Sequence, residues 1–72
     1  MTICKTIKER QATPICVYKM MEIHYSSGKP CKYFIGKYIN GRKDRQIVMP
    51  VSRQIADAVW EELELRLNDR NY

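Results

Sequence analysis

The chain is poor in the residues from which enzyme sites are usually built. Its 72 residues include one histidine, three cysteines and three glycines. The glycines are scattered, so no Gly-rich phosphate-binding loop is present. No apolar run approaches the roughly 20 residues that a membrane-spanning helix needs, so no membrane association is expected. A domain this small also has little interior left for a water-excluding pocket. We therefore expect no enzyme and no small-molecule substrate.

The three cysteines, Cys4, Cys16 and Cys31, are odd in number and widely spaced. Small secreted domains usually carry an even, dense set of cysteines, and the start of this chain lacks the apolar core of a signal peptide. Structural zinc sites bring their ligands in closely spaced pairs, which are missing here, and His24 is the single histidine. We expect reduced thiols used for packing, no metal, no other cofactor, and a cytoplasmic location.

The net charge of +5 is unevenly distributed along the chain. Residues 1–53 hold eleven Lys or Arg against three acidic residues, which gives +8. Residues 54–72 hold two Arg against five acidic residues, which gives −3. This asymmetry favours a cationic surface for a polyanion, with an acidic element elsewhere.

Alternating side chains predict three strands, over about residues 15–25, 31–39 and 45–49. The Asn40-Gly41 pair between the second and third strands is a strong hairpin signal, because both residue types tolerate the positive φ angles of a tight turn. We expect residues 1–14, which end at a proline, to form a mobile or loosely docked basic arm. Gly36, inside the second strand, indicates a bulge or a place where another backbone comes close.

A helix is predicted over about residues 53–68, with Ser52 as its N-cap. At 100° per residue, its apolar side chains fall on one broad face: Ile55, Ala56, Val59, Trp60, Leu63 and Leu67. The predicted fold is therefore α+β. A three-stranded antiparallel sheet packs against one C-terminal helix within a single domain of residues 15–72, and the other sheet face stays open.

Basic and aromatic residues interleave along the second and third strands and their turn. Lys and Arg neutralise phosphates, Arg reads guanine edges, and a two- or three-stranded ribbon fits the major groove. Aromatic side chains beside these charges could instead stack on unpaired bases. The alternative is a purely structural role, in which the aromatic side chains form the core and the lysines keep an exposed sheet soluble. The candidate nucleic-acid-binding residues are Lys29, Lys32, Lys37, Arg42, Lys43 and Arg45.

Residues 33–43 are Tyr-Phe-Ile-Gly-Lys-Tyr-Ile-Asn-Gly-Arg-Lys, and residues 52–60 are Ser-Arg-Gln-Ile-Ala-Asp-Ala-Val-Trp. Over residues 32–62, this order of strand, Asn-Gly-basic turn, strand and helix resembles AP2-type DNA-binding domains. It also resembles the amino-terminal arm-type-site domains of phage tyrosine integrases. Asp44, which interrupts the basic run, and the strand ending Val-Met-Pro depart from that pattern.

The resemblance implies a three-stranded sheet backed by one helix, with the open face of the sheet entering the major groove of double-stranded DNA. It implies DNA contacts from Lys32, Lys37, Arg42, Lys43 and Arg45, with Ala56, Val59 and Trp60 packing behind the sheet. No recombinase catalytic segment follows. The resemblance therefore implies a stand-alone binding module, such as a regulator of a phage or another mobile element.

The acidic side of the helix supports a second hypothesis, a protein–protein interaction module such as a phage-type inhibitor or adaptor. Asp57, Glu61 and Glu64 form an acidic stripe, and Leu65 lies off the apolar face. An open sheet edge is available for pairing with a partner strand. The stripe could also contact the basic sheet of a second copy in a homodimer, or it could simply be a solvated helix face.

Overall fold

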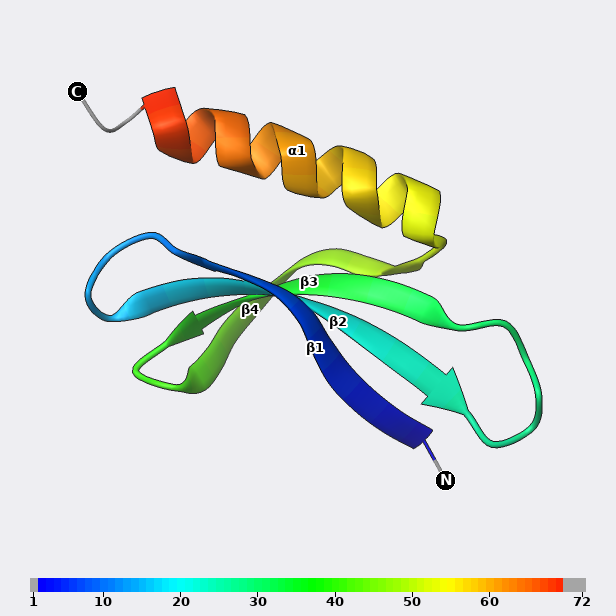
Figure 1. The fold of residues 1–72 in the computed structure, drawn as a ribbon. Coiled ribbons are helices and arrows are strands. Elements are labelled where there is room, and N and C mark those ends of the chain that lie inside the picture. Colours follow the sequence, from blue (N-terminus) through cyan, green and yellow to red (C-terminus); the bar gives the residue numbers. More distant parts are fainter. Residues whose placement is uncertain (1, 70–72) are drawn as a thin grey trace.

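The computed structural model describes residues 2–69. The elements in chain order are β1 (Thr2–Gln11), β2 (Cys16–Tyr25), β3 (Lys32–Ile39), β4 (Arg42–Val51) and α1 (Arg53–Asp69). The strands form one antiparallel sheet in the order β1-β2-β3-β4. Helix α1 lies against one face of this sheet (Figure 1). The predicted α+β fold, an antiparallel sheet with one C-terminal helix packed on it, is confirmed.

The sheet has four strands, whereas the sequence predicts three. The fourth is β1, which comes from the segment expected to form an arm. It pairs with β2 from Thr2 opposite Tyr25 to Gln11 opposite Val17. Most β1 side chains are exposed, so main-chain pairing rather than a buried face holds the strand. A strand of this kind gives little hydrophobic alternation, which explains why the sequence pattern does not reveal it.

The core lies between α1 and the sheet. Met20, Ile35, Ala56 and Trp60 form a buried cluster. Partly buried side chains from every element surround this cluster: Ile7, Tyr18, Tyr33, Val48, Val51, Val59 and Leu63. The apolar helix face is therefore largely as predicted. Ile55 and Leu67 are the exceptions, because both lie outside the cluster and Ile55 is 51% exposed.

Two local signals in the sequence are confirmed. Asn40 and Gly41 have φ angles of 53° and 80°, as a tight turn with positive φ at both central residues requires. Ser52 caps α1, because its Oγ accepts a hydrogen bond from the Ile55 amide at 3.5 Å and its carbonyl oxygen accepts one from the Ala56 amide at 3.0 Å. These features fix the direction of β4 and the start of the helix.

The edge strand β4 is irregular. Its register against β3 shifts at three places, one of them between Ile35 and Gly36. A Cβ atom at Gly36 would lie 3.0 Å from Cε1 of Tyr38, so the glycine leaves room for that ring. The sequence expectation of a bulge at Gly36 is confirmed, and the group that lies close to it is the Tyr38 side chain rather than another backbone. Such bulges twist an edge strand and hinder pairing with other chains.

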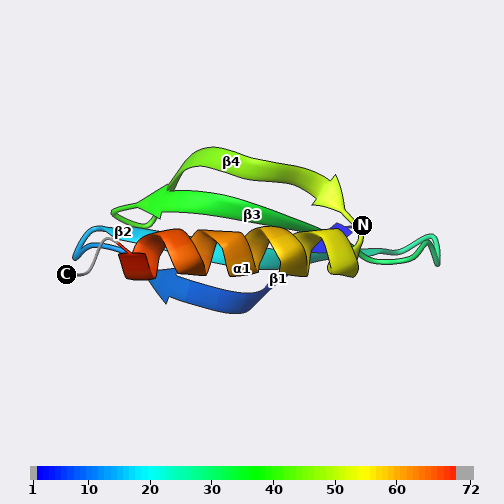
Figure 2. The ribbon, with the colours of Figure 1, turned by 90° about the horizontal axis from the view of Figure 1, so that it is seen from above.

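The sheet is covered on one face by α1. Viewed from above, the helix runs along the middle of the sheet, with β4 to one side and β1 to the other (Figure 2). Among residues 2–69, the opposite face carries no further element. Within the same residues, no helix has the length and apolar character needed to cross a membrane.

Candidate nucleic-acid interface

Cross-strand pairing places two of the predicted cations on the helix side of the sheet. Lys37 lies opposite Tyr18 on one neighbouring strand and opposite Arg45 on the other. Tyr18 packs against the core beneath α1. Because directly opposite residues share a face, Lys37 and Arg45 also belong to the helix side.

Lysines on the open face lie over aromatic rings. Lys43 Nζ is 4.7 Å from the centre of the Phe34 ring and donates a hydrogen bond to Gln46 Oε1 at 2.9 Å. Lys19 Nζ is 4.9 Å from the centre of the Tyr38 ring. An ammonium group above a ring face is attracted by the electrons of the ring. Phe34 is buried, so it leaves no ring face free for a nucleic-acid base.

The six predicted cations do not form one surface. Lys29 is in the β2–β3 loop, and Arg42 begins β4 directly after the β3–β4 turn. These two connections lie at opposite ends of the sheet (Figure 1). Lys32, opposite Ile23 at the start of β3, shares the end of the sheet with Lys29. The structure therefore brings together four of the six, which we call the hairpin cations: Lys37, Arg42, Lys43 and Arg45.

The hairpin cations are well placed to meet an anionic partner. Arg42, Lys43 and Arg45 are exposed, and Lys37 is half-buried. Within residues 2–69, none of the four forms a salt bridge. Asp44 is the single acidic residue between positions 37 and 46. The end of the β3–β4 hairpin therefore carries an excess of positive charge. Among residues 2–69, no acidic side chain forms a salt bridge with its four cations.

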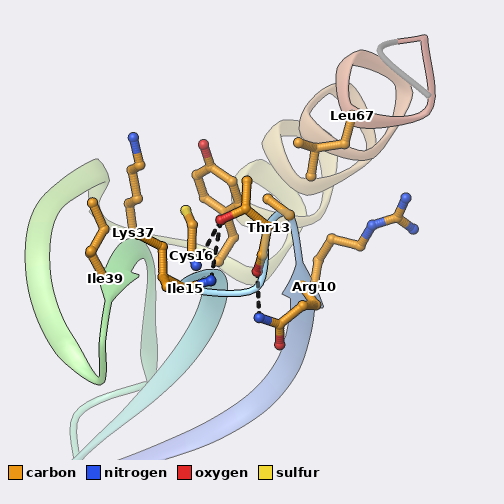
Figure 3. A pocket seen from close by; sticks show the side chains of 10 residues that line it. Arg10, Thr13, Ile15, Cys16, Lys37, Ile39 and Leu67 are labelled. Carbon is orange, nitrogen blue, oxygen red and sulfur yellow. Dashed lines mark hydrogen bonds between the residues drawn. The ribbon is translucent and has the colours of Figure 1, made fainter. Parts of the chain in front are cut away.

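A groove of about 410 Å³ lies beside Lys37 on the helix side of the sheet (Figure 3). The β1–β2 turn forms one wall, where Thr13 Oγ1 accepts a hydrogen bond from the Cys16 amide at 3.0 Å. Leu67 of α1 and Ile39 of β3 contribute apolar surface. The charged side chains that line the groove, Arg10 and Lys37, are both basic. The groove therefore extends the positive surface from the hairpin towards α1.

No protein-family model matches the chain, and comparisons with curated proteins and with solved structures give no match. The resemblance of residues 32–62 to AP2-type and integrase arm-binding domains therefore stays a prediction. The groove beside the hairpin adds Arg10 of β1 to the basic surface, a residue outside the set of six predicted cations.

The acidic side of α1 faces β1 and contacts it. Asp57 Oδ1 lies 3.4 Å from Lys8 Nζ and accepts a hydrogen bond from Arg53 Nε at 3.0 Å. Further along the helix, Arg10 donates a hydrogen bond to Asn68 Oδ1 at 2.6 Å. Two cations of β1 are thus used to dock the helix. Asp57, predicted to contact a protein partner, has partners within its own chain.

The other predicted protein-binding residues stay together. Glu61, Glu64 and Leu65 line a shallow hollow on the surface of the helix, together with Asn68. Leu65 is 61% exposed. The predicted interaction set is therefore divided, with Asp57 occupied at the start of the helix and the remaining three residues accessible further along it.

The ion pairs of Asp57 predict a specific acid sensitivity. The hydrogen bond from Arg53 holds the pKa of Asp57 below its ordinary value of 3.8, and Lys8 adds to this effect. The Asp57 carboxylate therefore binds a proton less readily in the folded state than in the unfolded state. Its contribution to stability is fully present above the pKa of the unfolded state and is lost as the pH falls through the pKa of the folded state. Urea denaturation between about pH 6 and pH 2 should show a shallower acid decline for Asp57→Asn than for the wild type.

The matched control is Glu61→Gln, since Glu61 is exposed and forms no salt bridge among the described residues. Its acid decline should follow that of the wild type. Equal declines for wild type and Asp57→Asn would show that the contacts of Asp57 do not stabilise the fold.

Proposed function

We propose that this chain is a non-enzymatic module that binds double-stranded DNA by placing its β3–β4 hairpin in the major groove. The observation that supports this most is the group of hairpin cations, which have no salt-bridge partner within residues 2–69. Basic side chains in such a position neutralise phosphates and release condensed counterions, the main source of affinity for DNA. A regulator of a phage or another mobile element is the biological role that fits such a module.

The dimensions favour the hairpin over the whole open face. Strands about 4.8 Å apart make a four-stranded sheet roughly 14 Å wide between its outer strands, before side chains are added. The major groove is about 12 Å wide and admits a two-stranded ribbon. The fourth strand therefore argues against the flat docking of a three-stranded sheet that the family resemblance implies. A hairpin that enters the groove would turn each of its two faces towards one wall of the groove. Cations on both faces could then contact the phosphates of both walls.

The aromatic residues favour duplex DNA over single strands. Single-strand binding usually relies on exposed aromatic platforms. Here Phe34 is buried beneath Lys43, the half-buried Tyr38 ring lies beneath Lys19, and Tyr18 and Tyr33 pack against the core. These aromatic side chains support the sheet and position the lysines, which leaves charge rather than stacking as the means of binding.

Protein binding through the acidic helix side is the second candidate. Leu65 and the hollow beside it favour this function, and a change such as Leu65→Asp would disrupt it. The contacts of Asp57 with Lys8 and Arg53 count against it, because they show that part of the acidic stripe already serves the fold. We therefore place DNA binding first.

Fluorescence anisotropy with a labelled duplex of about 15 base pairs tests the proposal. Measured from about 50 to 200 mM salt, the logarithm of the association constant should fall linearly with the logarithm of the salt concentration, with a slope of about −4 if all four hairpin cations contact phosphates. The Leu65→Asp variant should show the same dependence of the association constant on salt concentration as the wild type. A folded protein that shows no binding at about 50 mM salt would exclude the proposal.

A further inference from the structure

A glutamate, a histidine and a cysteine meet at the β2–β3 end of the sheet, away from the hairpin cations. Ile23 pairs with Lys32, so His24 and Cys31 follow as the next facing positions of the two strands. Glu22, two residues before His24, shares its side of the sheet. Their potential ligand atoms all lie within 4.8 Å of one another. The β2–β3 hairpin therefore gathers three metal-binding residue types that are not closely paired in the sequence.

The contacts within this cluster have a definite order. Cys31 Sγ lies 3.4 Å from Nδ1 of His24, and Nε2 on the other side of the imidazole ring contacts Glu22 Oε1. The second oxygen of the same carboxylate, Oε2, accepts a hydrogen bond from the Tyr33 hydroxyl at 2.8 Å. Glu22 is therefore held between the Tyr33 hydroxyl and the His24 ring, with one carboxylate oxygen on each.

We propose that Cys31 Sγ and His24 Nδ1 are ligands for a zinc-class divalent cation, with Glu22 orienting the His24 ring. Metal–sulfur and metal–nitrogen bonds of about 2.3 and 2.0 Å at a tetrahedral angle place the two ligand atoms roughly 3.5 Å apart, close to the separation found here. A carboxylate on the second ring nitrogen is the usual companion of a metal-binding histidine.

The coordination chemistry of the site is simple. Cys31 binds as the thiolate, so its proton passes to solvent when the metal–sulfur bond forms. His24 binds as the neutral ring, with its Nε2 proton directed at Glu22. His24 is exposed and Cys31 half-buried, so the remaining positions of a tetrahedral ion are open to water. The sequence predicts no metal because its potential ligands are not closely spaced along the chain. In the fold, the β2–β3 hairpin brings His24 and Cys31 close together across two strands.

Titration of the reduced protein with Co²⁺, a spectroscopic substitute for zinc, tests this proposal. Binding to Cys31 should produce a thiolate-to-cobalt charge-transfer band in the near ultraviolet, and added Zn²⁺ should remove the band. Cys31→Ser and His24→Ala should abolish it. Glu22→Gln should weaken binding by about 10- to 100-fold, as expected for a carboxylate that orients a ligand.

The matched control is Cys4→Ser, because Cys4 is exposed and lies opposite Ile23, on the other face of the sheet. This variant should keep the full band. A band that persists in Cys31→Ser, or that disappears in Cys4→Ser, would overturn the assignment. The nitrogen resonances of His24 in the wild type give an independent readout that needs no variant. They should shift on addition of Zn²⁺, and unchanged resonances together with no cobalt band would also overturn it.

Discussion

Replacing Arg42, Lys43 and Arg45 together by glutamate should weaken DNA binding at about 0.1 M salt by more than about a hundredfold and reduce the salt slope by about three. The three side chains are exposed and form no salt bridge within the described chain, and only Lys43 makes a cation–π contact, with Phe34, so the fold depends little on their charge. The melting temperature should therefore change little. Anisotropy with the same duplex, combined with circular dichroism, measures both quantities.

The matched control reverses three cations at the other end of the sheet. Lys5, Lys29 and Lys32 are also exposed, and their replacement by glutamate changes the net charge by the same amount. This variant should lose only the long-range part of the attraction and keep most of the affinity. If both variants bind equally weakly, net charge rather than the hairpin governs binding. If both bind like the wild type, the hairpin cations do not contact DNA.

Trp60→Ala should have the largest effect on stability. Trp60 is 3% exposed and packs in the cluster with Met20, Ile35 and Ala56. Truncating a buried tryptophan costs about 3–5 kcal/mol, through lost apolar burial and the cavity that remains. A domain of this size has a total stability of roughly 4–11 kcal/mol. The variant should therefore lose at least about a quarter of its stability, and it should unfold at room temperature if the wild type lies at the lower end of this range.

Urea denaturation followed by circular dichroism measures this loss without relying on tryptophan fluorescence. Leu65→Ala on the same helix is the control. Because Leu65 is 61% exposed, its truncation should change the free energy of unfolding by no more than about 0.5 kcal/mol. A loss below about 1 kcal/mol for Trp60→Ala would contradict the packing of α1 on the sheet.

The elements with strong local signals could be predicted from the sequence. Asn40-Gly41 fixes its turn through backbone conformation alone, and Ser52 caps α1 through a local hydrogen bond. The apolar stripe that includes Ala56 and Trp60 needs no partner to be recognised. Strand β1 could not be predicted, because its side chains are mostly exposed and its pairing partner is determined only by the assembled sheet.

The candidate site could be predicted only in part, for a related reason. Adjacent basic residues in a sequence do not share a surface when strands alternate and loops lie at opposite ends of a sheet. The sequence pattern therefore groups Lys29 with Arg42, although the sheet separates them. Likewise, Asp57 appears free in the sequence, and its contact with Lys8 depends on how β1 lies beside the helix. His24 and Cys31 lie on opposite sides of the β2–β3 loop, and their contact can be assigned only once the register of the two strands is known.

Titration of the isotope-labelled protein with a short DNA duplex, followed through backbone amide resonances, tests the central claim most directly. The hairpin proposal predicts that the largest shifts fall on residues 37–46, with smaller shifts at the groove beside Arg10 and little change along the outer side of α1. Shifts confined to α1, or spread over the open face of β1 and β2 while residues 37–46 remain unchanged, would contradict it.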